Sequence, residues 1–277
     1  MHVSFFRSRA SLTLAATLAA APLLSGCEVD SLFGPKPNAA VSALAQGARE
    51  DAERLEGSDP ELSALRGEQA LAFDAEVARL CGTLEDGSTP ASCSAEKVEE
   101  ASEPVETTGL EQIIATFGDL PEESRPLAAQ QAIILAEATG STDVAKAAQA
   151  ANLTEEPEAA EAAREVLRGE YALAYGVGVA KAFGATNLKD LTAAINERIA
   201  ALTTALEPTG EVPVAEAGYE ITGIASPTDA ASAQAFINAA IAQAADSWEA
   251  AAADAESNEG GWLNLAITGA AHAGRFR

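Results

Sequence analysis

The sequence predicts an all-helical protein, in which a group of shorter helices precedes a bundle of four long ones. Alanine, the strongest helix former, makes up roughly a quarter of the 277 residues. Aromatic residues make up only 5% of the chain, and a low content of aromatic and β-branched residues argues against sheets. Apolar residues recur at every third or fourth position, which is the spacing of one face of a helix.

The region 39–157 is expected to form the smaller helical group. Its first two helices are separated by Gly57-Ser58-Asp59-Pro60, in which Ser58 or Asp59 can cap the second helix and Pro60 fits its first turn. The acidic run at 94–108 is expected to be a solvated loop. The helices predicted here cover residues 39–56, 60–84, 109–117, 124–139 and 141–152.

The region 158–277 is expected to form the four-helix bundle. Its connections are short, long and short, and the long one, about residues 207–227, has prolines and glycines. A helix of about 20 residues is roughly 30 Å long, whereas 20 extended residues reach about 60 Å, so this connection can return along the bundle. Two antiparallel hairpins joined in this way have the topology of ferritin-like bundles. The predicted helices are 158–183 with Thr154 as the cap before its start, 188–206, 229–256 capped by Thr228, and 262–273.

The N-terminus has the pattern of a secretory signal. A positive start is followed by the uncharged stretch 10–24, which is too short for a comfortable membrane span. Leu24-Ser25-Gly26-Cys27 resembles the bacterial lipobox, which implies removal of residues 1–26 and acylation of Cys27. Residues 27–38 would then be the lipidated cysteine and its tether. The alternatives are an ordinary cleaved signal and an uncleaved anchor.

Cys81 and Cys93 are the remaining cysteines and bracket a segment rich in turn-forming residues. An extracytoplasmic location would permit their oxidation, and closing a loop of this size should stabilise the fold by about 3 kcal/mol. The sequence therefore predicts a disulfide. Two free thiols, or half of a metal site without further ligands, are the alternatives.

Four short motifs resemble an uncharacterised ferritin-like family, a domain of unknown function common in actinobacterial lipoproteins and secreted proteins. The resemblance covers about residues 160–277 and implies a fold and a compartment rather than an activity. The motifs are EYALAYGVGVAKAFG at 170–184, VAEAGYEI at 214–221, SPTDAASAQAFI at 226–237 and ITGAAHAGRFR at 267–277.

A complete di-iron centre is not expected, because such a centre uses Glu-x-x-His motifs and this sequence contains none. The only weak metal candidates are Glu170, Glu197 and His272, with Asp246 or Glu249 as a further acid. We expect instead that these acids are solvated or paired with Arg168, Lys181 or Arg198, and we expect no cofactor. Four further expectations concern packing. They are Tyr171, Tyr175 and Phe183 in the core, close helix approach at Gly176 and Gly178, Trp248 and Trp262 either packed together or capping the end of the bundle, and His272 near a helix C-terminus.

The charge balance limits the partners. The chain has 42 Asp and Glu against 17 Lys and Arg, a formal net charge of −25, which argues against nucleic acid and against docking to anionic lipid by charge. The sequence therefore predicts a non-enzymatic lipoprotein on the outer face of the cytoplasmic membrane, attached through Cys27. Its role would be a helical interaction or structural module with an envelope protein as partner. The alternative is a small-ligand or metal-binding ferritin-like bundle without a complete di-iron site.

Overall fold

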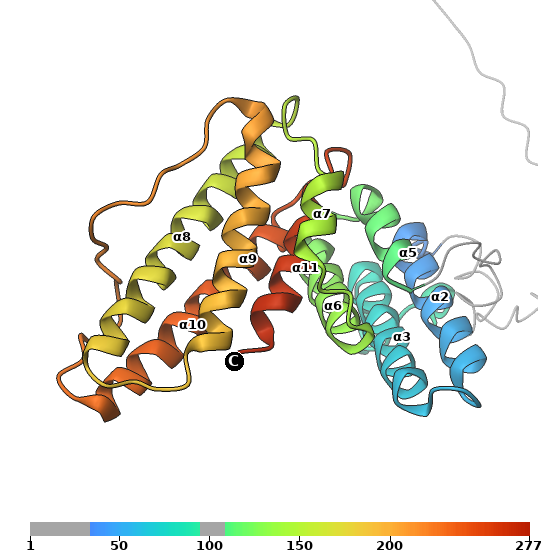
Figure 1. Ribbon diagram of the computed structural model, residues 1–277. Helices are drawn as coiled ribbons and strands as arrows, with labels where there is room; N and C mark the ends of the chain where they lie inside the picture. The colour runs from blue at the N-terminus through green and yellow to red at the C-terminus, as the bar shows by residue number, and fades with distance from the viewer. Residues whose placement is uncertain (1–33, 95–108) are drawn as a thin grey trace, which may run out of the picture.

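The computed structural model describes residues 34–94 and 109–277, and the regular structure in these two ranges is entirely helical (Figure 1). The all-helical prediction is confirmed. The lipobox and nearly all of the acidic run at 94–108 lie outside the described residues. The α-helices are α2 (Ala39–Leu55), α3 (Pro60–Cys81), α5 (Gly109–Thr116), α6 (Arg125–Thr139), α7 (Val144–Ala150), α8 (Pro157–Ala182), α9 (Lys189–Leu206), α10 (Ala230–Ala253) and α11 (Trp262–Gly274).

Local side-chain bonds explain where several helices begin. The predicted cap at Asp59 is confirmed, since its carboxylate accepts the Leu62 N–H at 3.1 Å and Pro60 is the first residue of α3. The predicted cap at Thr228 is wrong. Asp229 caps α10 instead, because its carboxylate accepts the Ser232 N–H at 2.8 Å while the Ser232 hydroxyl accepts the Asp229 N–H at 3.0 Å.

The predicted cap of α8 at Thr154 is also wrong, although the predicted range 158–183 is within one residue of the helix at both ends. The Thr154 hydroxyl donates to the Asn152 side chain at 2.7 Å, and α8 begins at Pro157, directly after Glu156. The preceding helix is shorter than expected for a related reason. The backbone N–H of Asn152 donates to the carbonyl of Gly260 at 2.9 Å, so this segment bonds to the loop before α11 rather than extending α7.

The helices form two groups joined by a central pair (Figure 1). At one end α2 packs along α3, with α5 against α2. At the other end α8 packs on α9 and α10, and α10 packs on α11. Between them α6 contacts α10 and α11, and α7 contacts α9 and α11. None of the described helices is long and apolar enough to cross a membrane.

One large hydrophobic core runs through both groups, from Val41 on α2 to Ala273 on α11. A smaller core lies between α8, α9 and α10 and includes Leu173, Ile195 and Ile237. Many of the buried core positions are alanine, which lets helix axes come close together. The boundary at residue 157 stays a prediction, since buried residues on both sides of it share the large core.

The connection between α9 and α10 begins with the 3-10 turn η4 (Glu207–Thr209) and then runs along the outside of α8 (Figure 1). We call residues 210–229 the crossover. The Tyr171 hydroxyl donates to the carbonyl of Pro213 at 3.3 Å, and a Cβ at Gly176 would lie 2.9 Å from the Ile221 side chain. Gly176 thus allows a close approach, but the nearest group is the crossover side chain of Ile221 rather than a neighbouring helix, and the Phe236 ring of α10 lies slightly farther away, at 3.5 Å. The same expectation is wrong for Gly178, around which an added Cβ would meet no atom within 4 Å.

Candidate functional site

Four side chains, one from each of the last four helices, meet inside the protein. They are Glu170 on α8, Arg198 on α9, Trp248 on α10 and His272 on α11, and we call them the central cluster. None of the four is more than 4% exposed. A polar group so deeply buried is costly unless it is paired, so the partners of each one define what this site can do.

The Glu170 carboxylate is the acceptor at the centre of the cluster. Arg198 donates to it from Nε at 2.6 Å and from Nη2 at 3.0 Å, one bond to each carboxylate oxygen. The Trp248 indole Nε1 donates a third bond at 2.6 Å. A bidentate guanidinium–carboxylate pair is strong and directional, and the indole bond connects it to a third helix. The predicted pairing of an acid with Arg198 is confirmed.

His272 joins the cluster from its other side. Its Nδ1 lies 3.4 Å from Arg198 Nη1, and its Nε2 lies 3.3 Å from a carboxylate oxygen of Glu197. Burial lowers the pKa of His272 below its ordinary value, the Arg198 charge lowers it further, and Glu197 opposes both. Burial therefore disfavours the charged imidazole. His272 lies near the C-terminal end of α11, as predicted.

The metal-candidate residues do not form a suitable donor set. Glu170 faces inward, but both its oxygens are bonded to Arg198, whose cationic charge would repel a metal ion. The Glu197 side chain is 62% exposed and lies beyond His272. No group of three or more His, Cys, Asp or Glu side chains among the described residues is arranged to hold a metal ion. Asp246 and Glu249 bond instead to Arg277 at the C-terminus.

A second buried ion pair, which was not predicted from the sequence, connects α2 to α3. Arg66 Nε donates to the Asp51 carboxylate at 3.0 Å and Nη1 donates to the Gln69 side chain at 2.5 Å. Gln69 in turn donates to the carbonyl of Gln131 on α6 at 2.8 Å. Burial lowers the pKa of Arg66 despite the nearby Asp51. The spacing of the sequence could have indicated this pair, because Arg66 lies four residues before Ala70 and so shares the buried face of α3.

The predicted disulfide is present: Cys81 at the end of α3 and Cys93 in the 3-10 turn η1 (Ala91–Cys93) are joined, with an S–S distance of 2.05 Å. Cys27 and the preceding residues Leu24, Ser25 and Gly26 lie outside the described residues, so their roles stay predictions.

The aromatic residues divide between core and surface. Trp248 and Trp262 stack with their ring centroids 6.4 Å apart, as expected, and Tyr171 packs against the core. The expectation that Tyr175 and Phe183 are core residues is wrong, because their exposed fractions are 40% and 42%. The helical spacing correctly placed Tyr171, Tyr175 and Phe183 on one face of the helix. That face lies against the crossover, which covers it only in part.

This partial covering leaves a hollow of about 680 Å³ between α8, α10 and the crossover, which we call the aromatic pocket. Its volume is within the range of small-molecule sites, about 300–1,000 Å³. Four of the lining residues are aromatic, and one carries a charge. Those used below are Tyr175, Phe183, Tyr219, Phe236 and Glu220.

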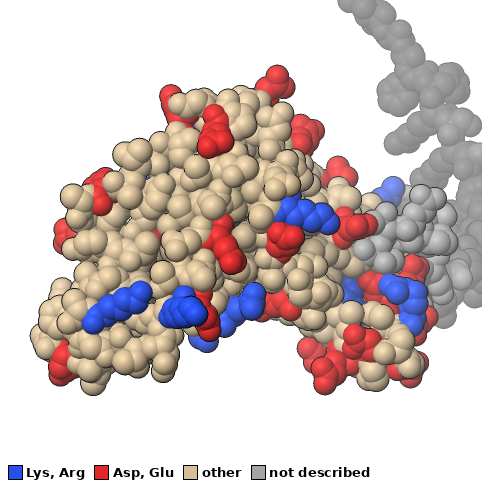
Figure 2. Space-filling model, viewed as in Figure 1, with Lys and Arg blue, Asp and Glu red and all other residues tan. Residues whose placement is uncertain are grey.

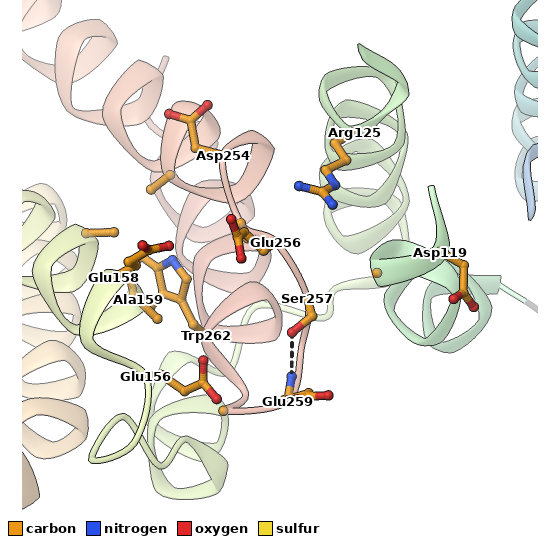
Figure 3. A pocket seen from close by; sticks show the side chains of 15 residues that line it. Asp119, Arg125, Glu156, Glu158, Ala159, Asp254, Glu256, Ser257, Glu259 and Trp262 are labelled. Atoms are coloured by element: carbon orange, nitrogen blue, oxygen red, sulfur yellow. Dashed lines mark hydrogen bonds between the residues drawn. The ribbon is translucent and has the colours of Figure 1, made fainter. Parts of the chain in front are cut away.

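A second pocket, of about 630 Å³, is mainly acidic (Figure 3). Arg125 extends into it from α6, opposite the connection between α10 and α11 that carries Glu256, Ser257 and Glu259. Acids also dominate elsewhere: on the face shown in Figure 2 carboxylates are widely spread and outnumber the basic side chains. The acids lining this pocket are Asp119, Glu156, Glu158, Asp254, Glu256 and Glu259.

Comparisons of the chain with protein-family models, with curated proteins and with solved structures found no match. The function proposed below therefore depends on the sequence motifs and on the geometry of these sites.

Proposed function

We propose that this chain is a lipid-anchored, non-catalytic binding module of the bacterial cell envelope, built on a ferritin-like four-helix bundle. The observation that carries the proposal is the central cluster. Arg198 occupies the space between the helices and takes up both carboxylate oxygens of Glu170. The polar centre of the bundle is thus used to hold helices together, which leaves the outer surface for recognition.

Two observations support the ferritin-like arrangement. The connections between the last four helices are short, long and short, and the crossover runs the length of α8 (Figure 1). Each of these four helices also contributes one side chain to the central cluster. The lipobox at Leu24–Cys27 supports the anchor, and the Cys81–Cys93 disulfide is in keeping with an oxidising compartment.

The interior offers little to catalysis. A general acid or base must reach its substrate, whereas the carboxylate of Glu170 and the ring of His272 are buried and bonded. The metal-binding alternative is disfavoured, because an ion at Glu170 would have to displace the guanidinium of Arg198. One observation favours the small-ligand alternative: the aromatic pocket is open and preformed. This pocket lies at the surface of the protein and not in the interior of the bundle.

The anchor can be tested by expressing the full chain in a bacterium that processes lipoproteins and supplying an alkyne-tagged fatty acid. We expect the tag on the protein and the protein in the membrane fraction. Cys27→Ser should abolish both, while the control Cys81→Ser/Cys93→Ser should keep both. A Cys27→Ser chain that is still tagged, or an untagged wild-type chain, would contradict the anchor.

The closed interior can be tested separately by elemental analysis of the purified full chain. We expect iron, manganese and zinc well below one atom per chain, with no change in Glu170→Gln. Stoichiometric metal that is lost in Glu170→Gln but kept in the surface control Glu158→Gln would show that the cluster opens to bind an ion, and would refute the non-catalytic assignment.

A further inference from the structure

We propose that the aromatic pocket binds an organic cation through an alkylated ammonium group. The inference rests on the proposed function in one respect, since it names the class of ligand that the binding module takes. It is carried by the rings of the pocket, by its single charge and by the way its walls are held in place.

The rings provide inclined faces on one side of the hollow. Tyr175 on α8 and Tyr219 on the crossover have ring centroids 5.8 Å apart and planes inclined at 55°. Phe183 comes from the end of α8, and Phe236 from the first half of α10. A cation is attracted to an aromatic face when it lies within about 6 Å of the ring centroid. The two tyrosines are themselves in contact, so an ammonium group would lie over the pair rather than between them, where it can satisfy this condition for both rings.

The exposure of these rings is unusual for this chain. The described residues include five large apolar side chains that are clearly exposed, and Tyr175 and Phe183 are two of them. Exposed aromatic surface that is gathered in a concave site, rather than scattered, marks a place of recognition. Phe236, by contrast, is only 6% exposed and forms part of the buried wall.

The charges favour a cation over an anion. Glu220 is the one ionisable acid among the lining residues, and no Lys or Arg belongs to that described lining. Lys181 on α8 donates from Nζ to the Thr192 hydroxyl on α9 at 3.1 Å and does not line the pocket. The formal net charge of −25 also raises the concentration of cations near the surface. A purely apolar ligand would gain nothing from Glu220.

The walls are held in place before any ligand arrives. The Tyr219 hydroxyl accepts the Glu216 N–H at 2.8 Å, which fixes the ring on the crossover. Gly176 lets Ile221 lie against α8, and Phe236 contacts the same position. A preformed site loses less conformational entropy on binding, so it can bind a small cation through few contacts.

The test is a titration of the purified full chain, in detergent micelles, with choline and with its neutral carbon isostere 3,3-dimethyl-1-butanol. The two probes have the same shape and differ in charge. We expect saturable binding of choline that is at least threefold tighter than binding of the isostere. Calorimetry gives the affinities, and ligand-observed nuclear magnetic resonance checks them when binding is weak.

Matched variants locate the site. Tyr175→Leu keeps an apolar side chain but removes a ring face, and Glu220→Gln removes the charge. Each should weaken choline binding at least threefold, while Glu158→Gln, an equal charge change in the acidic pocket, should leave it unchanged. Circular dichroism confirms that each variant is folded. Tyr175→Phe should restore most of the affinity, because it keeps the ring.

Three results would overturn the proposal. They are no saturable binding of choline, equal binding of the neutral isostere, which would indicate a neutral ligand, and equal loss in Glu158→Gln, which would indicate only general charge attraction. The failure of this inference is distinct from failure of the anchor. Fatty-acid labelling of Cys27 reports on the anchor, and neither readout depends on the other.

Discussion

Removing the charge of Arg198 should destabilise the fold strongly. Arg198→Met leaves the Glu170 carboxylate buried, with only the Trp248 indole still donating to it. Breaking a buried ion pair by removing one partner costs about 3–5 kcal/mol. Since small proteins are stable by only about 5–15 kcal/mol, this single change should remove a large part of the total.

The double variant Glu170→Leu/Arg198→Met should cost much less than the two single changes added together. It removes both charges. What remains is the Trp248 indole N–H without an acceptor, worth about 1–3 kcal/mol, and the Nδ1 of His272 without its longer contact of 3.4 Å to Arg198. We therefore expect the double variant to be destabilised by about that amount. The difference from the sum of the single changes measures the coupling between the two side chains.

The assay is denaturant unfolding of the full chain in detergent, followed by the helical circular dichroism signal. Arg198→Lys serves as a control, because it keeps a positive charge but cannot make both bonds to the carboxylate. It should lie between wild type and Arg198→Met. The assignment of this ion pair as a group that holds the helices together would be refuted if Arg198→Met lowered the free energy of unfolding by less than about 1 kcal/mol. Strict additivity of the two single changes in the double variant would refute it as well.

Three further predictions concern stability. Reducing the disulfide at Cys93 should lower the free energy of unfolding by about 3 kcal/mol, measured by unfolding with and without reductant; equal stability would contradict it. The pKa of His272 is lowered in the folded state, so its contribution to stability is present above pH 6.5 and is lost as the pH falls below that value. His272→Gln should therefore reduce the loss of stability below pH 6.5. An unchanged dependence of stability on pH would count against the burial of this ring. At Gly269 an added Cβ would clash with the buried Trp248 ring, so Gly269→Ala should lower the free energy of unfolding by about 1–3 kcal/mol. At Gly178 an added Cβ meets no atom within 4 Å, so Gly178→Ala should raise the free energy of unfolding by about 0.5–1 kcal/mol. Thermal melts that rank the two variants in the opposite order would disprove this packing.

Most helix positions could be predicted from the sequence, because apolar spacing and proline or glycine breaks are local signals. The last four helices lie within a few residues of their predicted limits. The errors fall at caps. Thr154 and Thr228 were expected to be caps and are not, because a cap depends on which backbone N–H a side chain reaches, and that is decided by the conformation of one or two residues.

The central cluster could be predicted only in part. Glu170 and Arg198 each stand on an otherwise apolar face of a helix, which indicates a buried partner but does not say which one. That Trp248 joins them depends on how α8 and α10 pack. The aromatic pocket was not predicted, because helical spacing places Tyr175 and Phe183 on one face without revealing that the crossover covers it incompletely.

The chain enters the described structure beside the disulfide, and this has a mechanical consequence. The Ser92 hydroxyl donates to the carbonyl of Pro35 at 2.8 Å, and Ser92 immediately precedes the cross-linked Cys93. Under the proposed anchoring, tension from the membrane would reach the protein at this point. It can pull Pro35 away from Ser92, but it cannot separate η1 from the end of α3 without breaking a covalent bond. The cross-link would thus carry tension directly from Cys81 to Cys93, so that residues 82–92 could not be drawn out even after α2 and α3 had unravelled.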